Sequence, residues 1–285
     1  MNLQRGPSPV TTRGLSRPSV WWIALALVAL SACKSKEPET ILAPDLSVEG
    51  SAFVLKLDDG RVLHGTQMQG AIVHMAVEGG QVGSIRLDSI VPDAEHPDVL
   101  RHEFRVQNEQ GAWVPACTPN AAGETWGFPI ALPEGHPGRE GPITLTCVSG
   151  AVGKCARFGY RPWAKGPKGE DLLPYHAACV QMVRADYCGD GVAHTKNGTT
   201  IDLYDDIGVQ MPGSKDDAEF AFEAGWGPKG AVCVARTRWP EIQTREALSA
   251  ACPRLAAAVD CNEDTARTSG ALLFNRSRPV ARTGS

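Results

Sequence analysis

Cysteine content constrains this chain more than any other feature of its sequence. The chain of 285 residues contains nine cysteines, and the first of them, Cys33, follows a segment typical of a secretion signal. The other eight are Cys117, Cys147, Cys155, Cys179, Cys188, Cys233, Cys252 and Cys261. An even set in an exported protein indicates a disulfide framework, here with roughly a hundred possible connectivities. None of the eight forms a C-x-x-C pair, so the spacing does not indicate a zinc ribbon or a thioredoxin-type site.

Residues 1–32 are expected to be a lipoprotein signal peptide. They carry three arginines and no acidic residue, and the apolar run 20–30 is shorter than the roughly 20 residues that cross a bilayer. Residues 30–33, Leu-Ser-Ala-Cys, resemble the lipobox of bacterial lipoproteins, in which the matching cysteine becomes the acylated first residue. The alternative is an ordinary cleaved signal followed by a chance cysteine. We expect an acylated Cys33 that holds the protein on a lipid bilayer, because two or three acyl chains anchor stably.

Residues 33–46 are therefore expected to be the lipidated cysteine and a polar, proline-containing tether. The residue after the cysteine is Lys34 rather than aspartate, which in proteobacterial lipoproteins favours the outer membrane. The predicted location is the cell envelope.

Composition excludes several classes of function. The formal charge of the whole chain is −4, and without the three signal arginines 25 basic residues stand against 32 acidic ones, a charge of −7. The chain has no basic arm that would indicate nucleic acid as a partner. The glycine-rich segment 150–154 lacks the spacing of a phosphate-binding loop. We expect no cofactor.

Residues 47–116 are predicted to be a β-rich domain or subdomain. Three pairs of β-prone runs, each joined by a short polar turn, predict hairpins: 51–57 with 61–65, 71–77 with 81–90 and 102–107 with 112–117. One polar face on each run favours an antiparallel meander or a small barrel. The histidines here lack ligand spacing and are expected on the surface or in hairpins: His64, His74, His96 and His102.

The segment between Cys117 and Cys147 is rich in proline and glycine and cannot hold a long helix. We expect a disulfide between these two cysteines, which would contribute roughly 3 to 4 kcal/mol by closing the loop. Trp126 and Phe128 are expected to fold back onto the body of the protein.

The stretch from His176 to Asp206 carries most of the unusual residues. A helix is predicted to begin near Pro174 and to end at Gly189 or Gly191. His176, Val180, Val183 and Tyr187 then share one core-facing stripe. Cys179 and Cys188 would lie about 13 Å apart along this helix, too far to bond to each other.

Several segments together resemble the bacterial ADYC-domain family. These are GKCARFGYRPW, HAACVQMVRADYCGDG, TKNGTTIDLYDD and GAVCVAR, and the resemblance covers roughly residues 47–240. The motif residues are His176, Arg184, Ala185, Asp186, Tyr187, Cys188 and Gly189. The resemblance implies an exported protein or lipoprotein and supplies no activity. We assign residues 117–275 to this domain.

Three interpretations of the motif remain open. In the first, Asp186 pairs with Arg161 or Arg184, or accepts N–H bonds from the turn Gly189–Gly191. In the second, carboxylates form a calcium site, with Asp186, Asp190, Asp202 and Asp205, together with Asp206, as candidates. In the third, Cys188 or Cys179 is the nucleophile of an extracytoplasmic hydrolase, with His176 or His194 as the base. The even cysteine count argues against a free thiol, and we name no catalytic residue.

The C-terminal part is predicted from shorter signals. Asn197-Gly198 predicts a hairpin turn, residues 241–260 predict short helices with Pro253 opening the second, and residues 271–274 resemble a strand. Residues 276–285 are expected to be a basic, solvated tail that carries Arg276, Arg278 and Arg282.

The predicted fold class is α+β, with an antiparallel β-rich N-terminal half packed with a disulfide-stapled, loop-rich domain around one central helix. We predict that Cys155, Cys179, Cys188 and Cys233 form two bridges, one on each side of that helix. The predicted function is a membrane-anchored lipoprotein that acts as a non-enzymatic binding or structural module for an envelope protein or polymer. A hydrolase that uses residues 176–206 is the alternative.

Overall fold

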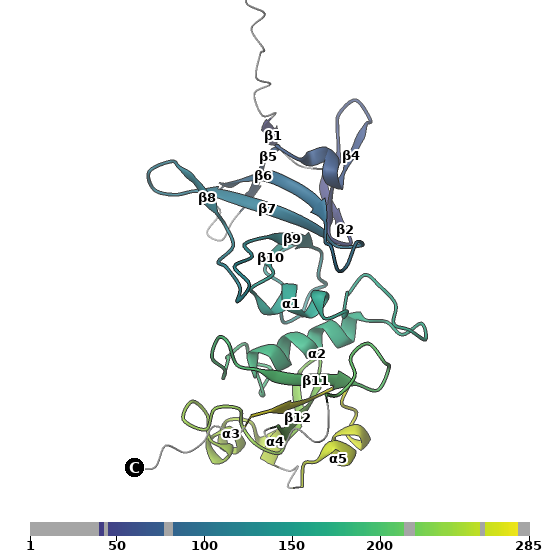
Figure 1. Ribbon diagram of the computed structural model, residues 1–285, viewed down its shortest axis with the longest axis vertical. Helices are drawn as coiled ribbons and strands as arrows, with labels where there is room; N and C mark the ends of the chain where they lie inside the picture. The colour runs from purple at the N-terminus through teal and green to yellow at the C-terminus, as the bar shows by residue number, and fades with distance from the viewer. Residues whose placement is uncertain (1–39, 43–44, 77–81, 214–219, 257–259, 279–285) are drawn as a thin grey trace, which may run out of the picture. The chain divides into compact units, whose positions relative to one another are not determined.

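The computed structural model describes residues 40–42, 45–76, 82–213, 220–256 and 260–278 (Figure 1). The strands are β1 Thr40–Leu42, β2 Leu46–Glu49, β3 Ala52–Lys56, β4 Val62–His64, β5 Ile72–Ala76, β6 Val82–Pro92, β7 Leu100–Gln107, β8 Trp113–Pro115, β9 Gly127–Ile130, β10 Thr144–Cys147, β11 Ile201–Asp205, β12 Ala221–Gly227, β13 Gly230–Val234 and β14 Leu273–Ser277. The helices are η1 Gly65–Met68, α1 Ala151–Arg157, α2 Leu173–Arg184, α3 Arg245–Ala251, α4 Pro253–Ala256 and α5 Glu263–Thr268.

The N-terminal half is built from the three predicted hairpins. Strands β3 and β4, β5 and β6, and β7 and β8 pair antiparallel, so the three hairpins are confirmed. Because β6 also pairs with β7, strands β5 to β8 form a meander, one of the two predicted arrangements, whereas β3 and β4 form a separate sheet with β2. The sheet continues past residue 116, because β7 contacts β9 and β9 pairs with β10. At the other edge β1 pairs with β5 in parallel. Residues 40–42 therefore belong to the sheet rather than to the expected tether, and residues 33–39 lie outside the described residues.

His102 lies in a strand of a predicted hairpin, one of the two places expected for it, but its side chain is not at the surface. Its side chain is fully buried in β7, where it stacks on Phe104 and meets Phe53 edge to face. Its Nδ1 lies 3.0 Å from the carbonyl oxygen of Leu100. The β-strand period places position 102 on the same face as Phe104, and this face is covered by the small sheet β2–β3–β4.

The Cys117–Cys147 disulfide forms as predicted, with the two Cα atoms 5.5 Å apart. It ties the end of β10 to the segment that follows β8. Trp126 and Phe128 are buried in one apolar cluster, which confirms that this proline-rich loop folds back onto the protein.

The second half is organised around α2. This helix packs against β12 and β13. These strands belong to a sheet with the strand order β11–β14–β12–β13. The predicted hairpin at Asn197-Gly198 is wrong: the turn is present, but β11 pairs with the distant strand β14, from Ile201 with Ser277 to Asp205 with Leu273. Because β14 lies between β11 and β12, its residue Arg276 is buried beside Glu263 and Asp202 and is not part of a solvated tail.

The predicted α+β class is confirmed, with antiparallel sheets, short helices and four disulfides. The chain divides into residues 1–37 and residues 38–285, and every described residue belongs to the second part. Cys33 and Arg282 lie outside the described residues. Among the helices that are described, none has the length and apolarity needed to cross a membrane.

Candidate functional site

The motif Ala185–Cys188 lies just beyond the central helix rather than inside it. Helix α2 begins as predicted at Leu173 with Pro174 in its first turn, but it ends at Arg184. Ala185 adopts the left-handed conformation, with φ 50° and ψ 40°. Its N–H bonds to the carbonyl of Met182, and the N–H of Asp186 bonds to that of Gln181. These two bonds form a Schellman motif with alanine in the position that glycine usually occupies.

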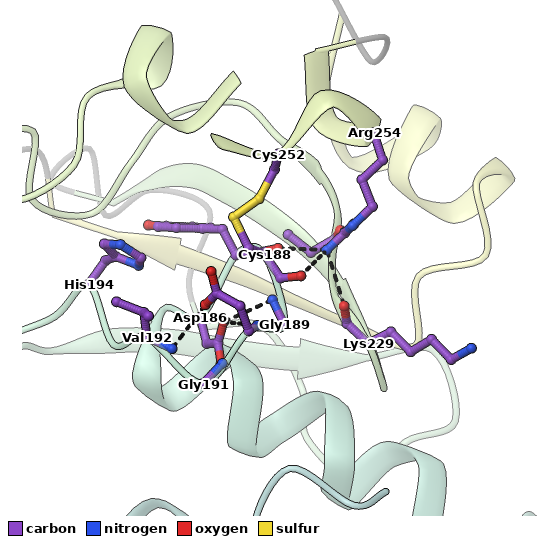
Figure 2. The surroundings of a disulfide bond; sticks show 12 residues. Asp186, Cys188, Gly189, Gly191, Val192, His194, Lys229, Cys252 and Arg254 are labelled. Carbon is purple, nitrogen blue, oxygen red and sulfur yellow. Dashed lines mark hydrogen bonds between the residues drawn. A yellow bond between two sulfur atoms is a disulfide. The ribbon is translucent and has the colours of Figure 1, made fainter. Parts of the chain in front are cut away.

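Asp186 organises the turn that follows. Its carboxylate accepts backbone N–H bonds from Gly189 at 2.8 Å, Asp190 at 3.1 Å and Gly191 at 2.8 Å (Figure 2). The predicted bonding to the Gly189–Gly191 turn is confirmed. Burial raises the pKa of the Asp186 carboxyl above its ordinary value, and the three N–H donors oppose that rise.

The alternative partners proposed for Asp186 are both engaged elsewhere. Arg161 forms an ion pair with Asp98 at 2.9 Å. Arg184 donates to the carbonyl oxygen of Gly191. A pairing of Asp186 with either arginine is therefore wrong.

Tyr187 joins the motif to a buried ion pair. Its hydroxyl donates to Glu223 at 3.1 Å and accepts the backbone N–H of Arg238 at 2.8 Å. Arg238 and Glu223 pair through two bonds of 3.0 Å, with side chains 2% and 0% exposed. The same guanidinium donates to the carbonyl oxygens of Met182 and Val183 at the end of α2. Arg238 thus caps this helix from a distant segment.

A second arginine holds the motif from outside (Figure 2). Arg254, in α4, donates to the carbonyl oxygens of Tyr187 at 2.8 Å, Cys188 at 3.0 Å and Lys229 at 3.1 Å, and it also donates to Ala231. The Cys188–Cys252 disulfide joins the same two segments, with Cα atoms 5.8 Å apart. Nothing near Arg238 or Arg254 in the sequence marks either residue as a partner of the motif.

The predicted connectivity around the helix is half right. Cys179 of α2 bonds to Cys155 of α1, and Cys179 and Cys188 do not bond to each other, as expected. Cys188 bonds to Cys252, and Cys233 bonds to Cys261, so the other predicted bridge is wrong. The reason is the early end of α2, since Cys188 lies in the turn that faces α4 rather than on the helix.

The disulfides also correct the hydrolase hypothesis. Cys179 and Cys188 are both bonded, and neither provides a thiol nucleophile. His194, the other proposed base, lies beside the ring of Tyr187 and 3.2 Å from the carbonyl oxygen of Ala185. The thiol mechanism is therefore wrong for this structure.

The aspartates proposed as calcium ligands accept hydrogen bonds in different turns and do not form one cluster. Asp205 accepts the N–H groups of residues 207–210 and the hydroxyl of Tyr160 at 2.5 Å. Asp202 accepts the N–H of Gly213 and lies 3.7 Å from Arg276. Asp190 accepts the N–H of Val192. The described residues contain no group of three or more acidic, histidine or cysteine side chains that could hold a metal ion.

His176 forms a buried pair that the sequence did not indicate. His136 Nδ1 accepts the N–H of Gly138, so its Nε2 carries the proton and faces His176 Nδ1 at 3.0 Å. His176 Nε2–H then donates to the carbonyl oxygen of Val152 at 3.1 Å. This order of donors assigns both rings as neutral. Burial lowers the pKa of His136 to about 4 and, together with the neighbouring ring, that of His176 to about 3.

Three adjoining hollows form one open groove beside the motif, which we call the Ser149 groove. The first, of about 540 Å³, lies between residues 149–158, the end of α2 and residues 193–201. The second, of about 440 Å³, extends toward residues 137–147, and the third, of about 480 Å³, toward residues 118–124. Ser149 lines all three hollows.

The first hollow of the groove has a cationic and hydroxyl-rich lining. Lys154, Arg184, Lys196 and Arg238 line it, and none of the described residues around it is an aspartate or glutamate. Arg184 is shared with the second hollow, and Lys154 with the third. Of the predicted motif residues, Arg184 alone lines the groove, because the others are turned toward the core or the Asp186 turn.

Comparison with known proteins gives one match. A family model described as the ADYC domain matches residues 65–240. This range contains every residue that lines the groove, whereas Cys252 and Arg254 lie beyond it. No curated protein and no solved structure matches the chain.

Proposed function

The chain belongs to the ADYC domain family, and from that premise we propose that it is an exported lipoprotein whose folded part is a rigid binding module of the cell envelope. One observation carries the proposal: Asp186, Tyr187 and Cys188 of the motif are bonded within the fold, while Arg184 lines an open groove beside them. Such a motif fixes a scaffold and leaves recognition to the groove.

The disulfides support the location. Eight cysteines form four bridges, which persist in oxidising, extracytoplasmic compartments. The lipobox-like residues 30–33 add the anchor, and in this proposal an acylated Cys33 holds the protein on the outer membrane.

The anchor is tested by metabolic labelling with an alkyne fatty acid in a bacterial host, followed by membrane fractionation. The full-length chain should take up the label and sediment with membranes, and Cys33→Ser should do neither. Cys117→Ser is unsuitable as a control because it breaks a disulfide, whereas Ser47→Ala changes an exposed residue and should leave labelling intact. A Cys33→Ser protein that is still labelled, or an unlabelled wild type, would contradict the lipoprotein assignment.

The binding role is tested by cosedimentation of the detergent-solubilised full chain with purified insoluble envelope material. Ser149→Trp fills the junction of the three hollows and should abolish binding, provided that its circular dichroism spectrum and melting temperature match those of the wild type. Ser47→Trp places the same bulk on the exposed face of β2 and should bind normally. Equal sedimentation of the two variants would rule out the groove as the binding site.

A further inference from the structure

We propose that the Ser149 groove binds a linear acidic polysaccharide, with its sugar carboxylates held by Arg184 and Lys154. This inference rests on the proposed binding function and names the chemical class of the ligand. It follows from the continuity of the groove, from the charges that remain unused in it and from the kind of side chain that lines it.

The groove is extended rather than a single pocket. The first hollow shares Gly150 and Arg184 with the second, and Lys154, Phe158 and Asn197 with the third. Each hollow has a volume of 440 to 540 Å³, within the range of about 300 to 1,000 Å³ that is usual for one small-ligand site. A free phosphate or a single sugar would fill only one of them. A chain of several sugars would occupy all three.

Two of the four cations in the first hollow are already neutralised. Arg238 is paired with Glu223, and Lys196 lies 2.7 Å from Glu241 and over the ring of Trp239.

Lys154 and Arg184 differ from these two. Within the described residues, neither lies within ion-pair distance of a carboxylate, and the described polar contact of the Arg184 guanidinium is the carbonyl of Gly191. Both side chains are half-buried, so an incoming carboxylate would meet charges that are only partly hydrated. The two cations stand at opposite junctions of the groove, which suits a ligand that carries repeated, spaced charges.

The rest of the lining matches sugar hydroxyl groups. The first hollow presents hydroxyl and amide side chains from Ser149, Thr195, Asn197, Thr199 and Thr200. Short side chains that both donate and accept hydrogen bonds complement the hydroxyls of a sugar ring. Phe158 is half-buried at the junction with the third hollow and offers the aromatic surface on which a sugar can pack.

Other polymers fit this lining less well. An acidic peptide would need pockets for its side chains, but only Phe158, Val183 and Ile201 give the first hollow a large apolar surface. A nucleic acid presents a charge about every 1.7 Å of helix axis. The described lining of the groove has three cations without an ion pair, Lys154, Arg184 and Arg139, and the second hollow also carries Glu140, so the groove does not match that charge density. A carboxylated glycan carries fewer charges per unit length than a nucleic acid, which matches the few, widely spaced cations of the groove.

The test uses the full chain in detergent and titrates it with hexagalacturonate, with alginate oligomers and with hyaluronate oligomers. Fully methyl-esterified hexagalacturonate is the neutral control, and tripolyphosphate and polyglutamate represent the other anions. At least one uronate should bind, its neutral ester should bind at least tenfold more weakly, and affinity should fall as salt rises.

Two substitutions locate the charges. Lys154→Gln and Arg184→Gln should each weaken uronate binding by about tenfold or more, the usual loss for one hydrogen bond to a charged group. Lys56→Gln removes the same charge from the exposed end of β3 and should have no effect. Melting temperatures identify any variant whose loss of binding reflects loss of fold.

Four other results would each overturn the acidic-glycan inference, and they differ in whether the proposed binding module survives. Equal binding of the acid and the ester, both blocked by Ser149→Trp, would leave a binding groove that does not select acids. Tighter binding of tripolyphosphate or polyglutamate than of every uronate would assign the groove to those anions. No uronate binding, while envelope material still sediments through the groove, would reject the acidic glycan and keep the binding module. If neither the uronates nor the envelope material bind, both the acidic glycan and the binding module are rejected.

Discussion

Arg238 serves three parts of the fold at once. It pairs with Glu223 in β12, caps the carbonyl oxygens at the end of α2 and donates its backbone N–H to the Tyr187 hydroxyl. Its side chain is 2% exposed, and its bonds to Glu223 and to the carbonyl oxygen of Met182 are buried. A buried ion pair is costly to break from one side, because the partner left behind keeps its charge without compensation.

We therefore predict that Arg238→Met lowers the free energy of unfolding by about 3 to 5 kcal/mol, measured by urea denaturation. Glu223→Gln should also destabilise, and the double substitution should cost clearly less than the sum of the two, because it leaves no unpaired charge. Additive losses would show that the two residues act independently. Lys229→Met, at an exposed position, is the control for the lost positive charge.

Gly189 is a second motif residue that does not tolerate substitution. Its φ is +71°, and a Cβ built there would overlap the carbonyl oxygen of Lys229. Gly189→Ala should therefore destabilise the protein by about 1 to 3 kcal/mol, through backbone strain and displacement of the segment that Arg254 holds. Gly191→Ala also has a positive φ, of +87°, but meets no atom within 4 Å and should cost less. Similar melting temperatures for the two variants would contradict this account.

For single residues, the sequence predicts hydrogen-bond partners that lie nearby in the chain but not those that lie far away. The bonding of Asp186 to the Gly189–Gly191 turn is local, so the residue types and their spacing are enough to predict it. Arg238 and Arg254 lie more than 50 residues from the carbonyl groups that they bind at the end of α2 and in the motif, and their neighbours in sequence carry no corresponding signal. The pair of His136 and His176 is concealed for the same reason.

At the scale of elements, the end of α2 was the main error. The predicted helix runs to Gly189 or Gly191 because glycine is the usual residue at a left-handed C-cap. In the structure Ala185 takes that conformation instead, since Arg238 caps the preceding carbonyls and Tyr187 is buried by tertiary packing. The N-terminal hairpins were predictable because each pairs strands that are neighbours in sequence. The pairing of β11 with β14 was not, because it joins distant strands.

The Cys188–Cys252 disulfide joins the motif to the pair of helices α3 and α4. We predict that replacing both cysteines by serine lowers the free energy of unfolding by about 4 kcal/mol, because the bridge closes a long loop of 64 residues. Chemical denaturation under non-reducing conditions measures the change. Replacing Cys117 and Cys147, which close 30 residues, should cost somewhat less. A melting temperature unchanged in the first variant would contradict a structural role for the bridge.

At the scale of the whole molecule, stability should depend on pH through three buried histidines. Burial lowers the pKa of His102 and His136 to about 4 and that of His176 to about 3. In the unfolded chain each has a pKa of about 6.5. Below that pH the unfolded chain binds protons that the folded chain does not, so the free energy of unfolding falls as the pH falls from about 6.5 toward 4.

Urea denaturation between pH 7.5 and pH 5 measures this dependence, since unfolded carboxyl groups titrate mostly below that range. The expected loss is on the order of 1 kcal/mol per pH unit for each buried histidine. His102→Gln should reduce the slope, whereas His64→Gln, at an exposed position, should not. A wild-type stability that is constant across the range would contradict the neutral, buried assignment.

The order of the disulfides along the chain sets a requirement on biosynthesis. The first two bridges join cysteines that are consecutive in sequence, Cys117 with Cys147 and Cys155 with Cys179. A chain that emerges through an export channel from its N-terminus can form them as each cysteine appears. The last two bridges interleave, because Cys233 lies between Cys188 and Cys252 while its partner Cys261 lies outside.

Oxidation in order of emergence would therefore first join Cys188 to Cys233, a non-native pair that only thiol exchange can undo. We expect the yield of native protein to depend on a disulfide isomerase in the host, which export from strains with and without that enzyme would reveal. A lower yield without that enzyme would show that maturation of this domain requires exchange of an early disulfide, even though all eight described cysteines are bonded in the finished molecule.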